Sequence, residues 1–512
     1  MLKRRYILLT LLLWGYFFYP VYISAEPSPR PFSRYEFSVN FDPTHNVISG
    51  DFVSRAGNEL LILGEKDNGD QVMAIYGFDA KADTFMPIDE YIIPDNIVAF
   101  DTLRDVNARD KIVLLSATRL SLINFDTDSI KDSRASLILD GESSIFVNPK
   151  PQFIAEKNLV RDFNGDGLDD IAISDFSYKK ILLQQSLNGE RQFVFQKLPI
   201  NSIVDMGKEQ IAFVERPMFS VDANFDELKD IVIAGDGELQ VYQQLANRTF
   251  TDQVEIIKLP MAVSDLPWWY LRDSDGDTAD QSTLSHQKLE SIMDINGDGI
   301  FDLMLMNTKS SGLLNRQNRY GIYFGKQESG KIVFGESPDT EIGSNGTLTG
   351  LRLLDVDMDD KQEVYVESFD IGLTQIIGAL ISGKIKQDIF FFSLNEEGKY
   401  DSEPNFNERV NLNFSLAQGR AGEPIVVTTD LDGDGLKELI VSSKNSRLAI
   451  HEGIDKLKHF YARTETVKIK LPDKGSMLVA RNIFSQEKKD LVIRYGRQDD
   501  PVLRRKIVVL SF

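Results

Sequence analysis

The stretch Asp294-Ile-Asn-Gly-Asp-Gly-Ile-Phe-Asp302, followed at once by Leu-Met-Leu-Met, decides the fold of this chain. It joins a nine-residue acidic loop to a short apolar run. Two near copies are Asp162-Phe-Asn-Gly-Asp-Gly-Leu-Asp-Asp170 and Asp430-Leu-Asp-Gly-Asp-Gly-Leu-Lys-Glu438, and each also leads into apolar residues. Self-similarity along a chain is the signature of a repeat architecture. The copies therefore predict that one structural unit is repeated.

Five weaker copies extend the pattern along the chain. Asp222-Ala-Asn-Phe-Asp-Glu-Leu-Lys-Asp230 and Asp355-Val-Asp-Met-Asp-Asp-Lys-Gln-Glu363 keep the acidic and amide positions but lose the glycines. The ranges 51–59, 101–110 and 482–490 keep the following apolar run but lose the inner acids. The eight copies end at positions 59, 110, 170, 230, 302, 363, 438 and 490, so their separations are 51, 60, 60, 72, 61, 75 and 52 residues. This spacing suits one four-stranded sheet per repeat.

The sequence between the loops predicts an all-β chain. Short β-rich runs alternate with Gly, Asn and Asp turns, which is typical of antiparallel strands, and no convincing helical period occurs outside the amino-terminal segment. We predict a β-propeller of four-stranded antiparallel blades, with eight blades favoured over seven. The last repeat offers only three strands, so residues 34–41 are expected to add its outer strand and cover an exposed sheet edge.

The composition excludes several classes of protein. Among 512 residues, 78 Asp and Glu outnumber 57 Lys and Arg, giving a formal charge of −21. A nucleic-acid partner is therefore excluded, because phosphates must be neutralised by positive charge. The chain has no cysteine, which rules out disulfides and thiolate metal sites, and four histidines argue against a His-rich metal centre. If the chain binds a metal ion, the ligands are therefore expected to be oxygen atoms.

The amino-terminal residues 1–25 read as a targeting segment. A basic start precedes an apolar stretch, then Pro20 and a small-residue end, which is the order of a secretory signal peptide cleaved after Ala25. The mature chain, 26–512, would then form a single propeller in a secreted or periplasmic location. The alternative is an uncleaved membrane anchor, because Tyr6 to Ile23 is just long enough to span a bilayer.

The five fuller loops are predicted to bind calcium, as structural sites rather than catalytic ones. Calcium takes six to eight oxygen ligands, and acids or amides at loop positions one, three and five, a carbonyl at seven and an acid at nine supply them. Their carboxylates would repel one another without a cation, so calcium should stabilise the fold. Hydrated acidic turns are the alternative, and the other three loops are expected to be metal-free. The predicted ligands are Asp162, Asn164, Asp166, Leu168, Asp170, Asp222, Asn224, Asp226, Leu228, Asp230, Asp294, Asn296, Asp298, Ile300, Asp302, Asp355, Asp357, Asp359, Lys361, Glu363, Asp430, Asp432, Asp434, Leu436 and Glu438.

The repeated Asp-x-Asn/Asp-Gly-Asp-Gly-x-x-Asp/Glu loop followed by a strand resembles the FG-GAP/VCBS repeat of integrin α-subunit-type propellers. Gly321-Ile-Tyr-Phe-Gly325 and Leu187-Asn-Gly-Glu-Arg-Gln-Phe193 resemble other parts of that repeat. The resemblance covers residues 34–512 and implies a propeller with calcium in the matching loops. Members of the family include adhesion modules, carbohydrate-handling proteins and pilus-associated propellers, so the resemblance does not name a ligand.

Ligand binding is expected on the face opposite the acidic loops. Insertions at 264–287, 307–319 and 394–423 are expected to project there. The first carries the candidate ligand-binding residues Trp268, Trp269, Tyr270 and His286; tryptophans in a polar loop stack on sugars or anchor partners, although they also fill gaps between blades. Asp273, Asp275 and Asp277 in the same insertion are either a sixth calcium site or a solvated turn.

These observations predict a calcium-stabilised module that binds a protein or a polysaccharide. The alternatives are a carbohydrate-active enzyme, similar to a polysaccharide lyase, and a purely structural role. A lyase would need His, Tyr or Arg as acid and base, and the sequence assigns no catalytic residue. A deep central pocket holding His286 with a Tyr and an Arg would favour the enzyme.

Overall fold

The computed structural model describes residues 31–104, 109–125, 134–146, 153–187, 190–207, 211–280, 282–310, 312, 316–344, 346–369, 380–415, 420–442, 446–454 and 464–512. The predicted signal peptide at 1–25 and His459 lie outside these residues. Within the described part of the chain, no helix is both long and apolar enough to cross a membrane.

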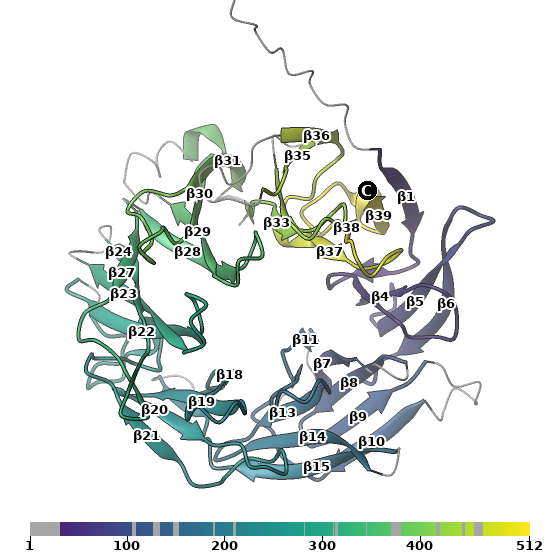
Figure 1. The fold of residues 1–512 in the computed structure, drawn as a ribbon. Helices are drawn as coiled ribbons and strands as arrows, with labels where there is room; N and C mark the ends of the chain where they lie inside the picture. Colours follow the sequence, from purple (N-terminus) through teal and green to yellow (C-terminus); the bar gives the residue numbers. More distant parts are fainter. Residues whose placement is uncertain are drawn as a thin grey trace, which may run out of the picture.

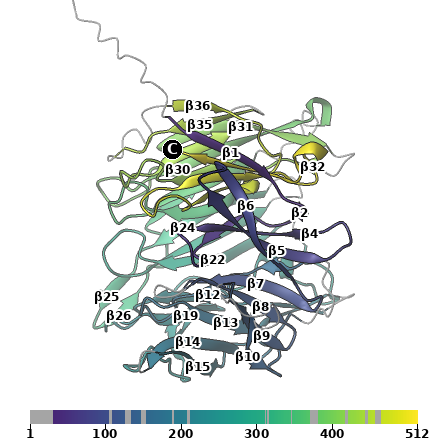
Figure 2. The same cartoon turned by 90° about the vertical axis from the view of Figure 1, so that its right-hand side faces the viewer.

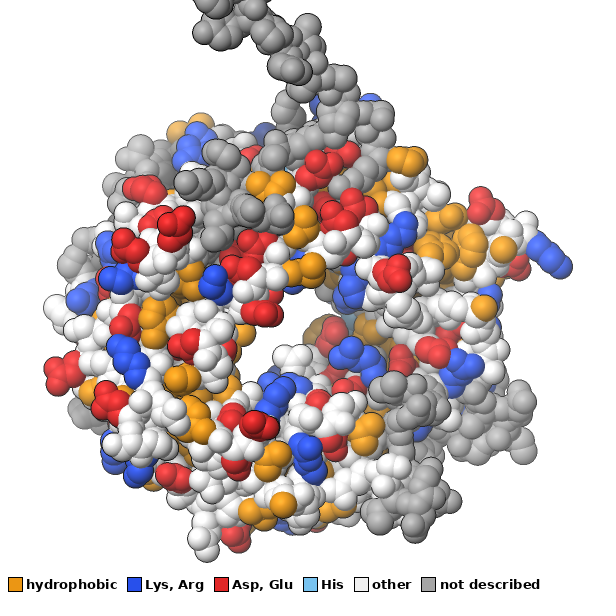
Figure 3. All heavy atoms as spheres, in the orientation of Figure 1, with side chains coloured by type: hydrophobic (Ala, Val, Ile, Leu, Met, Phe, Trp, Pro, Cys, Tyr) orange, Lys and Arg blue, Asp and Glu red, His pale blue; other side chains and the backbone are white. Residues whose placement is uncertain are grey.

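Eight β-sheets stand radially around an open central channel, and each has four or five strands (Figures 1 and 3). The prediction of an all-β propeller with eight blades is therefore confirmed. Helical structure in the described residues is limited to α-helical residues 380–382 and three 3₁₀ turns, η2 (Trp268–Tyr270), η4 (Gly475–Met477) and η5 (Pro501–Leu503).

The first four blades follow one another along the chain. Blade 1 has β2 (Asp42–Pro43), β3 (Ile48–Gly50), β4 (Glu59–Glu65), β5 (Gln71–Asp79) and β6 (Thr84–Ile92). Blade 2 has β7 (Ile97–Leu103), β8 (Lys111–Ser116), β9 (Arg119–Ile123), β10 (Ala135–Asp140) and β11 (Ala155–Glu156). Blade 3 has β12 (Val160–Arg161), β13 (Asp170–Ser174), β14 (Lys179–Leu187) and β15 (Glu190–Leu198). Blade 4 has β18 (Phe219–Val221), β19 (Asp230–Gly235), β20 (Glu238–Tyr242) and β21 (Glu255–Lys258).

The remaining blades complete the ring. Blade 5 has β22 (Ser285–Met293), β23 (Asp302–Ser310), β24 (Arg316–Tyr323) and β27 (Thr340–Gly343). Blade 6 has β28 (Thr347–Leu354), β29 (Glu363–Phe369), β30 (Lys384–Phe392), β31 (Phe406–Ser415) and β32 (Arg420–Ala421). Blade 7 has β33 (Val426–Thr429), β34 (Glu438–Ser442), β35 (Arg447–His451) and β36 (Thr464–Lys468). Blade 8 has β37 (Leu478–Arg481), β38 (Asp490–Arg494), β39 (Lys506–Ser511) and β1 (Ser33–Ser38), while hairpins β16 (Ile203–Met206)–β17 (Ile211–Val214) and β25 (Lys326–Glu328)–β26 (Lys331–Val333) lie outside the blades.

The amino-terminal strand closes the ring, as the sequence predicts. β1 pairs antiparallel with β39 from Ser33↔Ser511 to Ser38↔Lys506 and forms the outer strand of blade 8. It also lies beside β6 of blade 1 (Figures 1 and 2). The two ends of the chain are therefore held together in one sheet, which removes an exposed edge.

The core consists of eight apolar clusters, one between each pair of neighbouring blades. In β4, Leu60 and Ile62 pack toward blade 8, while Leu61 and Leu63 pack toward blade 2. Successive side chains of a strand point to opposite faces, and both faces of each blade are covered. This is why the second strands read as continuous apolar runs.

Two of the three expected insertions are wrong as loops. Residues 307–310 and 316–319 belong to β23 and β24, which pair with each other, and residues 406–415 form β31, which pairs with β30. Their polar residues resemble those of a loop because outer and extended strands of a blade are partly solvated and alternate polar with apolar side chains. The segment between Leu394 and Tyr400 also lies on the acidic-loop face, where the Tyr400 hydroxyl donates to the carbonyl of Gln362 at 2.5 Å.

Candidate calcium loops and the opposite face

All five predicted calcium loops join the first strand of a blade to its second strand. The loop ending at Asp302, for example, connects β22 to β23, and the loop ending at Glu363 connects β28 to β29. The three degenerate loops occupy the same place in blades 1, 2 and 8. Because each blade repeats the same order of strands, all eight loops lie on one face of the propeller.

The five loops share one backbone conformation. Their fourth and sixth residues have positive φ angles in every copy, including the two without glycine, where Phe225 (φ 65°), Glu227 (φ 69°), Met358 (φ 59°) and Asp360 (φ 63°) adopt it. A left-handed conformation costs a non-glycine residue about 1–2 kcal/mol. The 222–230 and 355–363 loops therefore adopt the same turn although its backbone conformation is unfavourable for their non-glycine residues.

The first, third and fifth residues wrap the turn through their side-chain oxygens. Asp294 accepts hydrogen bonds from the N–H groups of Gly297 (2.8 Å) and Gly299 (2.8 Å). In each loop the seventh residue donates its N–H to the fifth-position carboxylate at 2.9–3.0 Å, from Leu168, Leu228, Ile300, Lys361 and Leu436. The predicted ligand positions are thus gathered within a single turn.

The ninth residue is buried and bonded to the loop backbone. Asp302 accepts from the N–H of Ile295 at 2.8 Å and from that of Gly325 at 2.9 Å. The degenerate loops of blades 1 and 8 keep this acid in the same role: one oxygen of Glu59 accepts from the N–H groups of Phe52 (2.9 Å) and Val53 (3.1 Å), and one oxygen of Asp490 accepts from two N–H groups of its own loop. The ninth acid therefore closes the loop in copies with and without the inner carboxylates, a role that sequence reasoning had assigned only to a metal. Its retention in the degenerate loops was the signal for it.

Burial disfavours the charged form of these ninth acids. It raises the pKa of Asp170 and Asp302 to about 7, of Asp230 to about 6 and of Glu363 to about 8, and the neighbouring loop carboxylates raise these pKa values further. A bound cation would act in the opposite direction. The loops therefore have acids that a divalent ion would return to their charged form.

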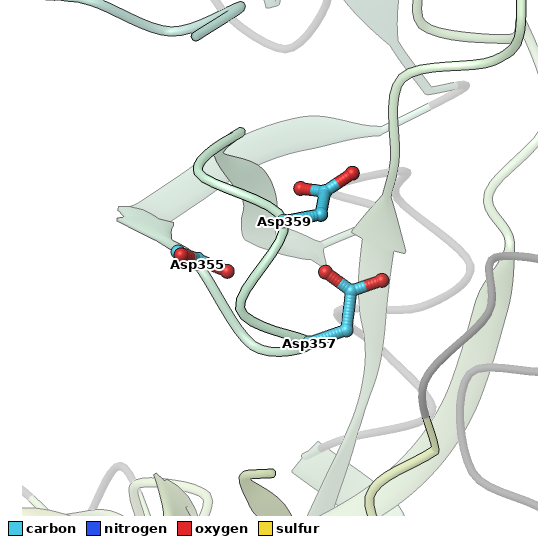
Figure 4. Close-up of side chains that lie close together, drawn as sticks. All are labelled: Asp355, Asp357 and Asp359. Atoms are coloured by element: carbon cyan, nitrogen blue, oxygen red, sulfur yellow. The ribbon is translucent and has the colours of Figure 1, made fainter. Parts of the chain in front are cut away.

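The donor set of the 355–363 loop fits calcium. The carboxylate oxygens of Asp355, Asp357 and Asp359 lie within 4.8 Å of one another and face a common space at the turn (Figure 4). Oδ1 of Asp357 is buried and has no hydrogen-bond partner. A second such group is Asp430, Asp432 and Glu438. Hard oxygens at this spacing, with one acceptor unsatisfied, match the ligands that calcium takes.

The loops are also hydrogen-bonded to one another around the ring. The N–H of Gln362 donates to the carbonyl of Ile295 at 2.9 Å, and the N–H of Lys437 donates to that of Val356 at 3.1 Å. Equivalent bonds run from Lys489 to Asp430, from Asn58 to Ile483 and from Asp110 to Asp51. Because of these hydrogen bonds, a change in the conformation of one loop would alter the contacts of that loop with the neighbouring blade.

The tryptophan turn lies on the opposite face, in the connection from blade 4 to blade 5. Trp268 is half-buried beneath the guanidinium of Arg316, which lies 4.0 Å from its ring centre, whereas Trp269 is 46% exposed. Tyr270 is half-buried. Nε2 of His286 donates to the carbonyl of Leu266 at 2.7 Å, so this histidine holds the turn in place. The four predicted residues are therefore close together, with Trp269 as the accessible ring.

The turn containing Asp273, Asp275 and Asp277 is exposed and closed by its own backbone, with the N–H of Asp273 donating to the carbonyl of Asp277 at 2.8 Å. Among the residues that the structure describes, the two acidic groups whose oxygens gather within 4.8 Å do not include this turn.

An exposed apolar hairpin that the sequence did not predict lies beside the tryptophan turn. The β16–β17 hairpin connects blade 3 to blade 4 on the same face, and it exposes Met206 (66%) and Ile211 (63%). An ion pair between Asp205 and Arg272 at 2.7 Å ties it to the tryptophan turn. The signal for it in the sequence is a pair of short apolar runs, at 203–204 and 211–214, on either side of residues 207–210, which have no apolar side chains.

Comparisons with known proteins add little beyond the fold. No family model matches the chain, and no curated protein matches it. Among solved structures, it is similar to an Agrocybe aegerita lectin described as specific for non-reducing terminal N-acetylglucosamine, with 13% identity, a TM-score of 0.38, and 95% of this chain and 96% of that chain covered. It is also similar to the WD40 domain of SCAP from fission yeast, with 10% identity, a TM-score of 0.36, and 94% and 98% of the two chains covered. These similarities are too low to carry a function to this chain.

Proposed function

We propose that this protein is a calcium-stabilised propeller that binds a protein or a polysaccharide outside the cytoplasm. We further propose that it is related to the FG-GAP/VCBS propellers, since five loops share both the acidic pattern and one backbone conformation. The amino-terminal sequence supports export, and a cysteine-free chain gains its stabilisation from metal ions instead of disulfides.

Calcium would be held by the carboxylates, amides and carbonyls of the five fuller loops. The unsatisfied oxygen of Asp357, buried between Asp355 and Asp359, is the observation that best supports an ion there. When bound, calcium supplies positive charge that neutralises the loop acids. The loop residues position that charge, and the bonds between loops connect each site to its neighbour.

The binding role rests on one observation: exposed aromatic and apolar side chains gather on the face opposite the loops. Trp269 and the β16–β17 hairpin are joined there by the ion pair of Asp205 with Arg272. Exposed apolar groups that are contiguous mark interaction sites more often than scattered ones. The described histidines support binding over catalysis, because His286 and His45 are bonded to backbone carbonyls and His451 is buried.

The proposal is tested by measuring calcium content and ligand binding on the purified chain. About five calcium ions per chain and a higher unfolding temperature with calcium than with chelator are expected, and no metal-dependent shift would refute the metal sites. Binding to arrays of glycans and to purified envelope proteins should fall in a Trp269→Ala variant for at least one ligand. Turnover of a polysaccharide in the same assay would instead favour the enzyme.

A further inference from the structure

A cavity of about 960 Å³ lies at the seam where the first and last blades meet. Six segments line it: residues 43–44 at the start of blade 1, the turn between β4 and β5, the connection from β6 to β7, residues 153–154 just before β11, the connection from β36 to β37, and the turn after β38. In every blade such segments lie on the face opposite the acidic loops. The cavity is therefore on the proposed binding face, on a different side of the ring from the tryptophan turn (Figure 1).

The segments that line the cavity are held rigidly before any ligand binds. The carboxylate of Asp499 accepts hydrogen bonds from the N–H groups of Asp473 at 2.9 Å and of Gly496 at 2.7 Å, which ties the two segments of blade 8 together. Gly475 packs so closely that a Cβ there would lie 1.7 Å from the carbonyl oxygen of Pro424. Rigid walls reduce the entropy lost when a ligand binds.

One wall presents an aromatic platform. The Phe153 ring is 56% exposed and stacks on the His45 ring, with 4.7 Å between centres and 17° between planes. His45 is itself held by a hydrogen bond to the carbonyl of Ile154 at 2.6 Å and by the Thr44 hydroxyl at 2.9 Å. Phe153 is thus fixed from beneath and offers an apolar surface to the cavity.

The polar groups around this platform suit a neutral ligand. The lining has four acids and three bases, so its net charge is close to zero, which disfavours phosphates and polycations. Oε1 of Gln498 is buried and lacks a hydrogen-bond partner, and the amide of Gln71 and the carboxylate of Asp95 also line the cavity. An unsatisfied buried acceptor requires a donor such as a hydroxyl.

From this combination we infer that the seam cavity binds a neutral oligosaccharide. An aromatic face packs against the C–H groups of a sugar ring, while amides and carboxylates bond its hydroxyls. The cavity volume is within the range of small-molecule sites. A bound sugar would contact blade 1 through Gln71 and blade 8 through Gln498. This inference rests on the proposed binding function and names its site and ligand class.

The test is binding of the purified chain to an array of neutral and acidic oligosaccharides, followed by titration with the neutral sugar that gives the strongest signal. Phe153→Ala and Gln498→Ala should each weaken its binding at least tenfold, while Phe195→Ala, which removes an exposed ring on the outer strand β15 of blade 3, should leave it unchanged. Unfolding temperatures in calcium within 2 °C of the wild type, a margin of about 2 kcal/mol for a chain of this size, would show that the variants are folded.

Each outcome decides the inference separately from the proposed function. No binding to any neutral oligosaccharide would overturn the saccharide site, while protein binding that depends on Trp269 would leave the proposed function standing. Sugar binding lost in Trp269→Ala but kept in both cavity variants would place the site at the tryptophan turn and also overturn the inference. Preference for acidic or phosphorylated glycans would overturn the neutral class.

Discussion

The ninth acid of the 355–363 loop separates the two roles of these residues, as ligand and as loop closure. Glu363 is buried, its Oε2 accepts the N–H of Val356 at 3.0 Å, and burial raises its pKa to about 8. Without calcium at pH 7 it is therefore mostly protonated. Glu363→Gln closely copies that neutral form and keeps an oxygen for Val356, so the calcium-free variant should lose less than about 1 kcal/mol of unfolding free energy.

Adding calcium should separate the Glu363→Gln variant from the wild type in unfolding free energy. A ligand at 100 times its Kd stabilises the folded state by about 2.7 kcal/mol, and a hundredfold weaker site would give only about 0.4 kcal/mol at the same concentration. Glu363→Gln removes a charge that the ion needs, so the gain on adding calcium should shrink by about 2 kcal/mol. One bound ion per chain should also be lost at low calcium.

The matched control is Glu59→Gln, in a loop predicted to be metal-free. A single oxygen of Glu59 accepts both N–H groups of its loop, so glutamine can keep both hydrogen bonds. Urea unfolding of both variants with calcium and with chelator, together with metal analysis, measures the effect. An equal calcium gain in both variants would refute the ligand role of Glu363, and a large calcium-free loss in Glu363→Gln would refute the protonated form.

Three further predictions concern the fold. Gly299→Ala should cost about 1–2 kcal/mol in urea unfolding, because φ is 83° and nothing lies within 4 Å of the new Cβ; an unchanged midpoint would contradict this. Phe37→Ala, in the core between blades 8 and 1, should cost about 3–5 kcal/mol by the same method, whereas exposed Phe32→Ala should cost far less. Burial lowers the pKa of His45 to about 4, so the unfolded chain takes up its proton first and stability falls as the pH drops below about 6.5, by about 2 kcal/mol at pH 5. His45→Gln should show a smaller loss between pH 7 and pH 5, and equal losses would refute a buried neutral His45.

The repeat and its apolar runs were sufficient to predict the architecture. Each acidic loop leads into a strand such as Leu60 to Leu63, whose side chains are all buried because neighbouring blades cover both faces. The closure by β1 was also predictable, since the last repeat lacked one strand. These features are local or follow from counting, so they do not depend on how distant segments pack.

The candidate sites were predictable only in part, because their residues come together through the ring. The ligand positions within each loop are close in sequence, and the structure gathers them in one turn. The role of the ninth acid in closing the loop, the bonds between loops and the seam cavity could not be predicted. In the cavity, Phe153, Gln71 and Gln498 are brought together by closure of the first and last blades.

The sequence by itself determined that this chain repeats an acidic turn and a buried strand, because both signals are contained within about a dozen neighbouring residues. The tertiary structure alone decided which polar stretches are strands, which tryptophan is exposed and where a cavity opens. Those properties depend on contacts between residues hundreds of positions apart, such as Asn46 with Arg494 at 3.2 Å, which no local pattern encodes.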